Sequence, residues 1–182
     1  MSGPLLGPGR PAGPRVPLTE EQPAALGGPV LAVPSARDMH ALGMRLAGVL
    51  RAGDLIVLTG PLGAGKTVLV QGMGAGLGVR GAVVSPTFVI ARVHRAGGPG
   101  GLPLVHVDAY RLSSLDEVDD LDLDVDAADA VTAVEWGAGL VEQLSDARLE
   151  IAIGRAPDTE ERTVRLMPFG GDWAARISGL AP

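Results

Sequence analysis

The stretch LIVLTGPLGAGKTVLVQG, residues 55–72, constrains the fold more than any other part of the sequence. Its first five residues form a short apolar and β-branched run, which is typical of a strand buried on both faces. Gly60, four intervening residues, Gly65, Lys66 and Thr67 then fit the pattern G-x-x-x-x-G-K-[ST], and a helical pattern follows. The stretch therefore predicts a buried strand, a phosphate-binding loop and a helix, in that order.

The residue types in this loop suit an anionic ligand. Glycine lacks the Cβ atom that would block a tight turn, so backbone N–H groups can point at phosphate oxygens. Lys66 is the single lysine among fifteen basic residues, and we expect it to contact the β- and γ-phosphates while the Thr67 hydroxyl binds Mg²⁺. The helix start adds the positive end of its dipole. We expect the nucleotide-binding residues to be Gly60, Leu62, Gly63, Ala64, Gly65, Lys66, Thr67 and Val68.

The identity of the nucleotide and the support for the metal ion follow from other parts of the chain. GTPases read guanine with an Asn-Lys-x-Asp element, but this sequence has no asparagine and no second lysine, so ATP is the expected substrate. An acidic residue at the end of a neighbouring strand usually supports Mg²⁺. Asp108 ends the apolar run LPLVHVD and Glu135 ends VTAVE, and in a parallel sheet ligands gather at such strand ends.

The remaining pattern predicts an α/β domain. Ser35 and Asp38 have the spacing of a helix cap, before apolar residues at helical spacing as far as Gly53. The helix after the loop is expected to reach about Leu77. Two strands joined by a glycine-rich loop are predicted by TFVIARVHR and LPLVHVDAY. Three more strands are predicted by VTAVEW, RLEIAIG and RTVRLMP. We predict a P-loop NTPase-like three-layer fold, a mixed and mainly parallel sheet flanked by helices.

Composition limits the domain organisation and the classes of function. Residues 1–29 are rich in proline and glycine without a period, so we expect a disordered extension there and a single ATPase domain over residues 30–182. The absence of cysteine excludes disulfides, thiolate metal sites and a cysteine nucleophile. A signal peptide pattern and a long apolar run are also missing, so a cytoplasmic protein is expected. The net charge of -6 argues against autonomous binding to nucleic acid.

Four motifs in succession, LTGPLGAGKT, VSPTFVIARV, LVHVDAYRL and VTAVEW, resemble the TsaE (YjeE) family of bacterial ATPases between about Val33 and about Ile153. The resemblance implies a small ATPase needed for the threonylcarbamoyl modification of adenosine beside the anticodon of ANN-decoding tRNAs. It also implies two partner proteins, TsaB and TsaD, of which TsaD carries the transferase chemistry. ATP hydrolysis would drive or reset their complex, and tRNA would be contacted only indirectly.

The resemblance also implies roles for residues outside the loop. Ser85, Thr87 and Phe88 match a switch-like segment of the family, in which the threonine lies close to the terminal phosphate and contributes to catalysis. Tyr110 and Arg111 match the family's H-x-D-x-Y-R element, and Arg111 is a candidate for charge stabilisation or partner docking.

Asp108, in the same element, is expected to orient or activate the attacking water. Glu135 matches the acidic Mg²⁺ ligand of the family, and Trp136 the aromatic residue beside it. Trp136 lines the nucleotide pocket or belongs to the core. His106 alternates with apolar valines on its strand, and we interpret it as structural.

Two other functions are compatible with a phosphate-binding loop. A small-molecule kinase would need a lid bearing an arginine cluster, but Arg92, Arg95 and Arg111 are scattered. A nucleotide-binding switch without turnover would not need the acids Asp108 and Glu135. The acidic run LDEVDDLDLDVDAAD does not place glycine and glutamate as a calcium-binding loop requires, so we interpret it as a solvated face.

Overall fold

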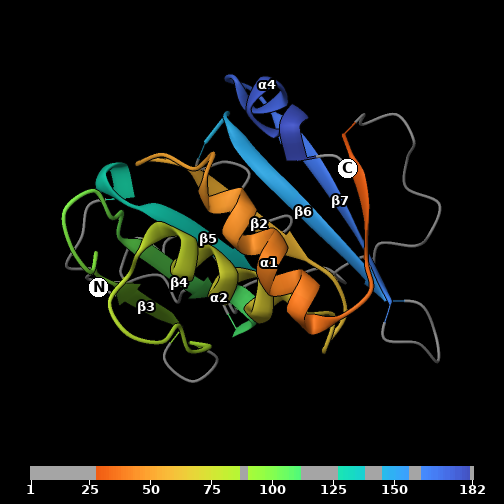
Figure 1. Ribbon diagram of the computed structural model, residues 1–182, viewed down its shortest axis with the longest axis horizontal. Coiled ribbons are helices and arrows are strands. Elements are labelled where there is room, and N and C mark those ends of the chain that lie inside the picture. The colour runs from red at the N-terminus through yellow and green to blue at the C-terminus, as the bar shows by residue number, and fades with distance from the viewer. Residues whose placement is uncertain (1–27, 87–89, 112–126, 138–144, 156–160, 181–182) are drawn as a thin grey trace, which may run out of the picture.

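The computed structural model of the protein describes residues 28–86, 90–111, 127–137, 145–155 and 161–180 (Figure 1). Of the extension predicted at residues 1–29, residues 1–27 therefore lie outside the described residues. The described helices are α1 (Ala36–Ala47), α2 (Lys66–Leu77) and α4 (Trp173–Ile177), with short 3₁₀ turns at Ala109–Arg111, Ala127–Asp129 and Ser178–Leu180. The strands are β1 (Val30–Val33), β2 (Leu55–Thr59), β3 (Ala91–His94), β4 (Leu104–Asp108), β5 (Val131–Glu135), β6 (Arg148–Arg155) and β7 (Arg162–Phe169).

The strands form one mixed sheet in the order β1-β7-β6-β2-β5-β4-β3. The central strands are parallel, since β2 pairs with β5 and β6 and β4 pairs with β5 in parallel register. The outer pairs β1 with β7, β6 with β7 and β3 with β4 are antiparallel. The predicted α/β class, with a sheet that is parallel in its middle and flanked by helices, is confirmed.

The parallel register brings the ends of three strands to one edge of the sheet. Asp108, the last residue of β4, lies opposite Glu135, the last residue of β5. Leu58 of β2 lies on the other side of Glu135, so the loop that follows β2 begins beside the two acids. Such an edge of a parallel sheet is where ligands bind in open α/β folds.

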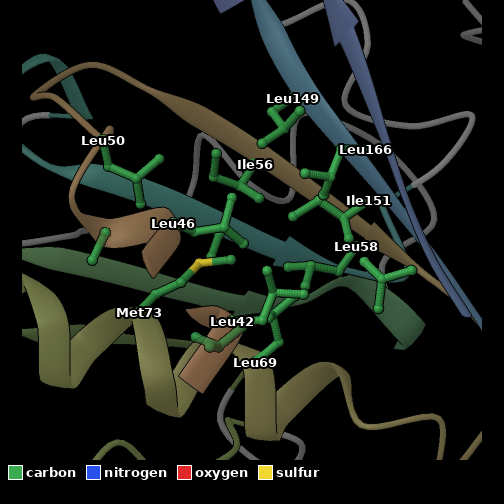
Figure 2. Packing of buried hydrophobic residues seen from close by; sticks show 14 of the residues in the cluster. Leu42, Leu46, Leu50, Ile56, Leu58, Leu69, Met73, Leu149, Ile151 and Leu166 are labelled. Carbon is green, nitrogen blue, oxygen red and sulfur yellow. The ribbon is translucent and has the colours of Figure 1, made fainter. Parts of the chain in front are cut away.

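Helices α1 and α2 pack side by side on one face of the sheet (Figure 1). Alternation along β2 divides its apolar residues between the two faces, because successive side chains of a strand point in opposite directions. Ile56 and Leu58 join the helices in the larger apolar cluster, whereas Leu55 and Val57 belong to a second cluster on the opposite face. Figure 2 shows the larger cluster, in which side chains of α1, α2, β2, β6 and β7 meet, including Leu46, Ile56, Met73, Leu149 and Leu166.

Helix α1 begins as the sequence predicts but ends earlier. The Ser35 hydroxyl oxygen accepts the backbone N–H of Asp38 at 3.2 Å, which satisfies one of the free donors of the first turn. The helix stops at Ala47, not near Gly53, because the following N–H groups switch to tighter i→i−3 bonds. Gly53 has a φ of +83° and donates its N–H to Ala130 O at 2.8 Å, so it begins the approach to β2.

The C-terminal helix α4 is tied to the segment between α1 and β2. Arg176 forms an ion pair with Asp54, and its Nε atom donates to the carbonyl oxygen of Val49 at 2.9 Å. Its guanidinium also lies 3.9 Å from the ring centroid of the buried Trp173. Within the described ranges, no helix is both long enough and apolar enough to cross a membrane.

Candidate nucleotide-binding site

The loop between β2 and α2 has a backbone that depends on its glycines. Gly60, Gly63 and Gly65 have φ angles of +145°, +77° and +106°, in the region that side chains with a Cβ atom rarely adopt. A Cβ atom on Gly60 would also lie only 2.4 Å from the carbonyl oxygen of Ile153. Gly65 is the N-cap of α2, so the free N–H groups of the first helical turn open toward the end of the loop.

A cavity of about 570 Å³ lies at this end of the sheet. The first turn of α1, the glycine loop, the ends of β4 and β5 and the start of β7 contribute to it. The structure brings most of the residues predicted from the sequence into its lining, namely Leu62, Gly63, Gly65, Lys66, Thr67, Val68, Ser85, Asp108, Tyr110, Glu135 and Trp136.

Gly60 and Ala64 were predicted to bind nucleotide but are not among the lining residues. Ala64 is fully buried and packs in the larger apolar cluster. Gly60 contributes through its carbonyl oxygen, which accepts a hydrogen bond from Lys66. Leu62 is 90% exposed and covers the outer rim of the cavity.

Lys66 lies at the centre of the site and is only 4% exposed. Its Nζ atom donates to the carbonyl oxygens of Gly60 at 2.9 Å and Pro61 at 3.0 Å, and lies 3.8 Å from the ring centroid of Trp136. Burial lowers the pKa of the Lys66 ammonium, and the nearby negative charges of Glu135 and Asp108 oppose that shift. The Lys66 ammonium therefore contacts two loop carbonyl oxygens and lies near two carboxylates.

A cluster of polar side chains surrounds the carboxylate of Glu135. The Thr67 hydroxyl donates to Glu135 Oε1 at 2.8 Å, and His106 Nε2 lies 2.9 Å from the same oxygen. Asp108 Oδ1 accepts the backbone N–H of Tyr110 at 3.1 Å. Hard oxygen ligands of this kind, two buried carboxylates and a hydroxyl facing one cavity, are what Mg²⁺ prefers. The donor set fits the predicted metal ion.

Aromatic side chains form one wall of the cavity. The rings of Trp136 and Tyr110 meet edge to face with centroids 5.5 Å apart. Trp136 has a positive φ of +63°, which is unusual for a bulky residue. Its backbone N–H donates to the carbonyl oxygen of Leu58 at 3.0 Å. Of the two positions that the sequence leaves open for Trp136, the structure places it in the cavity wall.

Two polar residues near the loop were not recognised as part of the site from the sequence. Arg162, at the start of β7, is buried and donates its Nε to the carbonyl oxygen of Ala64 at 3.0 Å. It lies almost a hundred residues beyond the loop, and no motif in RTVRLMP indicates that Arg162 belongs to the site. His106 was interpreted as structural, but it points away from the second cluster that holds Val105 and Val107 and contacts Glu135. Its position two residues before Asp108 places it on the same face of the strand as that acid, and this was the signal in the sequence that could have assigned it to the site.

The structure describes part of the predicted switch segment. Ser85 is exposed and lines the cavity. Thr87 and Phe88 lie outside the described residues, and for Arg111 only the backbone is described, in the 3₁₀ turn after β4. Their roles stay predictions. Most of the acidic run between β4 and β5 also lies outside the described ranges.

Comparison with known proteins relates this fold and site to a family. Residues 33–164 match the family model described as threonylcarbamoyl adenosine biosynthesis protein TsaE. The Streptomyces coelicolor tRNA threonylcarbamoyladenosine biosynthesis protein TsaE is 61% identical over 148 residues, which cover 79% of this chain and 99% of that protein. The Mycobacterium bovis protein of the same name is 48% identical over 142 residues, covering 75% and 84% of the two chains.

A solved structure agrees with the sequence relatives. The crystal structure of Bacillus subtilis YdiB superposes with a TM-score of 0.68 at 31% identity, and the match covers 85% of this chain and 94% of that one. The family match spans β2, the glycine loop, α2 and the strand ends that carry Asp108 and Glu135. The chain belongs to the TsaE family of threonylcarbamoyl adenosine biosynthesis proteins.

Proposed function

We propose that this protein is a Mg²⁺-dependent ATP hydrolase that serves the formation of threonylcarbamoyladenosine in tRNA. The observation that carries the proposal is the convergence of Lys66, Thr67, Asp108 and Glu135 on one cavity beside a glycine loop. Membership of the TsaE family supports the link to tRNA modification. The cavity supports the step in which a nucleotide is bound and hydrolysed.

The loop and Lys66 are suited to the phosphates of ATP. Backbone N–H groups at the start of α2 offer hydrogen-bond donors and the positive end of the helix dipole. Lys66 would exchange the carbonyl oxygens of Gly60 and Pro61 for phosphate oxygens. A charged acceptor binds an ammonium more strongly than a neutral carbonyl does, so the exchange favours the nucleotide-bound form.

Thr67 and Glu135 would hold Mg²⁺, which neutralises charge on the phosphates when it is bound. The Thr67 oxygen has lone pairs for a metal ion while its hydrogen remains bonded to Glu135 Oε1. Asp108 would accept a hydrogen bond from the attacking water and orient its oxygen toward the γ-phosphorus. The water oxygen would bond to the γ-phosphorus as the bond from that phosphorus to the oxygen bridging to the β-phosphate breaks. ADP would leave with the bridging oxygen, and the proton lost by the water would pass by way of Asp108 to the inorganic phosphate.

We further propose that the ATPase works with TsaB and TsaD in the cytoplasm and reaches tRNA only through them. The net charge of -6 gives the chain little attraction for a phosphate backbone. A small-molecule kinase has less support, because Arg162 is the single arginine among the described residues that line the cavity. An arginine cluster over the phosphates would be expected for that chemistry.

Calorimetry and turnover assays test the site and the reaction together. Lys66→Ala should weaken ATP binding by about 2–5 kcal/mol, the range for truncating one side of a buried charged pair. Arg92→Ala serves as a control, since Arg92 is exposed on β3 and is not among the lining residues of the cavity. The wild-type protein should hydrolyse ATP slowly alone and faster with TsaB and TsaD.

Two results would contradict this assignment. If Lys66→Ala bound ATP with wild-type affinity, the phosphate site would lie elsewhere. If a screen of acceptors showed ATP-dependent transfer of phosphate to a small molecule, with no hydrolysis in its absence, the kinase alternative would replace the ATPase.

A further inference from the structure

A buried histidine lies behind the carboxylate that faces the cavity. His106 is 0% exposed, and its Nε2 atom lies 2.9 Å from Glu135 Oε1. An ionised carboxylate can only accept hydrogen bonds, so the Nε2 atom carries the hydrogen of this contact. His106 and Thr67 therefore donate to the same oxygen from two different elements, strand β4 and helix α2.

The convergence on Oε1 fixes how the carboxylate of Glu135 is turned. Two donors on one oxygen restrict rotation of the carboxylate group about its last bond, while one donor alone would leave it freer. Among the described residues, both side-chain donors contact Oε1 and none contacts the second oxygen, Oε2. That oxygen keeps its lone pairs for a cation or for water bound to the cation.

A purely structural role explains His106 poorly. Its Nδ1 atom is buried and has no hydrogen-bond partner among the described residues. A buried polar atom without a partner costs free energy, so an apolar side chain would fill this position better if packing were the only requirement. The contact with Glu135 is the one described interaction that uses the polarity of the ring.

We propose that His106 is a positioning residue that holds the carboxylate of Glu135 in the orientation required to bind the metal ion. The inference rests on the proposed function, because it takes Glu135 as a metal ligand. His106 does not touch the reacting atoms in this arrangement. It acts through Glu135, as outer-shell partners of metal ligands commonly do.

Binding of Mn²⁺, measured by electron paramagnetic resonance in the presence of ADP, tests the proposal without relying on turnover. His106→Leu removes the donor but keeps an apolar side chain in the buried space. His106→Gln keeps an N–H donor at the end of the side chain. His94→Leu is the matched control, since His94 is also buried and its ring centroid lies 6.5 Å from that of His106, while its Nε2 has no partner in the described structure.

We expect the dissociation constant for Mn²⁺ to rise about 10-fold or more in His106→Leu. His106→Gln and His94→Leu should stay within a few-fold of wild type, and metal-free ADP affinity should be unchanged in all three variants. Circular dichroism and a melting curve establish that each variant is folded.

The outcomes separate this inference from the proposed function. A folded His106→Leu variant with wild-type Mn²⁺ affinity would overturn the positioning role alone. Equal weakening in His106→Leu and His94→Leu would also overturn it, because a general packing defect would then explain the loss. A wild-type protein that binds ADP but no Mn²⁺ would overturn the proposed metal site, and the inference with it.

A double-mutant cycle with Glu135→Ala tests whether His106 acts through Glu135. If it does, adding His106→Leu to Glu135→Ala should cause no further loss of Mn²⁺ affinity. Additive losses in the double variant would show that His106 affects the metal ion by another route and would contradict the proposal.

Discussion

Asp108 and Glu135 end adjacent parallel strands, yet their immediate partners differ. The carboxylate of Glu135 accepts hydrogen bonds from two side chains, Thr67 and His106. Asp108 accepts one backbone N–H, from Tyr110, two residues further along the chain. A carboxylate oxygen that two side-chain donors hold suits a fixed metal ligand. A carboxylate that has, within the described ranges, a single local bond can turn toward a substrate water. We therefore expect the two acids to have different tasks.

Substitution of each acid should separate these tasks. Glu135→Ala should raise the Mg²⁺ concentration needed for half-maximal ATP turnover by about 10-fold or more, because a metal ligand is lost. Asp108→Asn should leave ATP affinity unchanged and slow turnover by about 100-fold, the lower end for loss of a catalytic acid or base. Metal titrations of the steady-state rate measure both effects. Identical Mg²⁺ titrations of wild type and Glu135→Ala would reject this division.

Sequence reasoning located the residues of the site whose signals are local. Lys66 and Thr67 follow from a motif of eight consecutive residues, and Asp108 and Glu135 from their places at the ends of apolar runs. Arg162 could not be found in that way. Its contact with Ala64 O depends on β6 pairing with β2, which lies far earlier in the chain, and on β7 then pairing with β6.

At the scale of elements, α1 and α2 approach each other closely through glycines. A Cβ atom on Gly72 would lie 2.1 Å from the carbonyl oxygen of His40, and one on Gly43 would lie 2.3 Å from that of Leu69. Backbone atoms cannot move aside as the end of a flexible side chain can. This close packing fixes α2 against α1 and, with it, the first turn of α2 at the cavity beside the glycine loop.

Gly72→Ala should therefore destabilise the protein even though alanine favours a helix over glycine by about 1 kcal/mol. We expect the free energy of unfolding to fall by about 1–3 kcal/mol, as for other overpacked sites. Urea denaturation followed by circular dichroism measures the change. Gly98→Ala is the control, because a Cβ atom there meets nothing within 4 Å, and it should stay within about 0.5 kcal/mol of wild type. A Gly72→Ala variant at least as stable as wild type would contradict the close helix contact.

The elements themselves were largely predictable, but their arrangement was not. Apolar runs and helical patterns located most of the strands and helices α1 and α2, and the capping pair Ser35 and Asp38 located the start of α1, whereas α4 was not predicted. The early end of α1 at Ala47 has no comparable signal in the sequence, and Gly53 instead donates its N–H to Ala130, the residue before β5. The order of the strands follows from which faces pack together, and a single sequence carries no direct signal of that.

The molecule as a whole combines the proposed nucleotide site with a net charge of -6. An acidic protein gains little from the release of counterions that drives most binding to nucleic acid. Membership of the TsaE family supports a role in tRNA modification, and we therefore expect other proteins to hold the tRNA. The nucleotide state of this chain would reach the tRNA by changing how it contacts those proteins.

The level of threonylcarbamoyladenosine in cellular tRNA is the measurement that links the proposed nucleotide site most closely to this role. The protein is depleted in its native cell, and bulk tRNA is digested to nucleosides for mass spectrometry. We predict that the modified nucleoside falls on depletion, recovers with a wild-type copy, and does not recover with a Lys66→Ala copy produced at the same level. A normal amount of the modified nucleoside after depletion, or full recovery with Lys66→Ala, would contradict an ATP-dependent role in this modification.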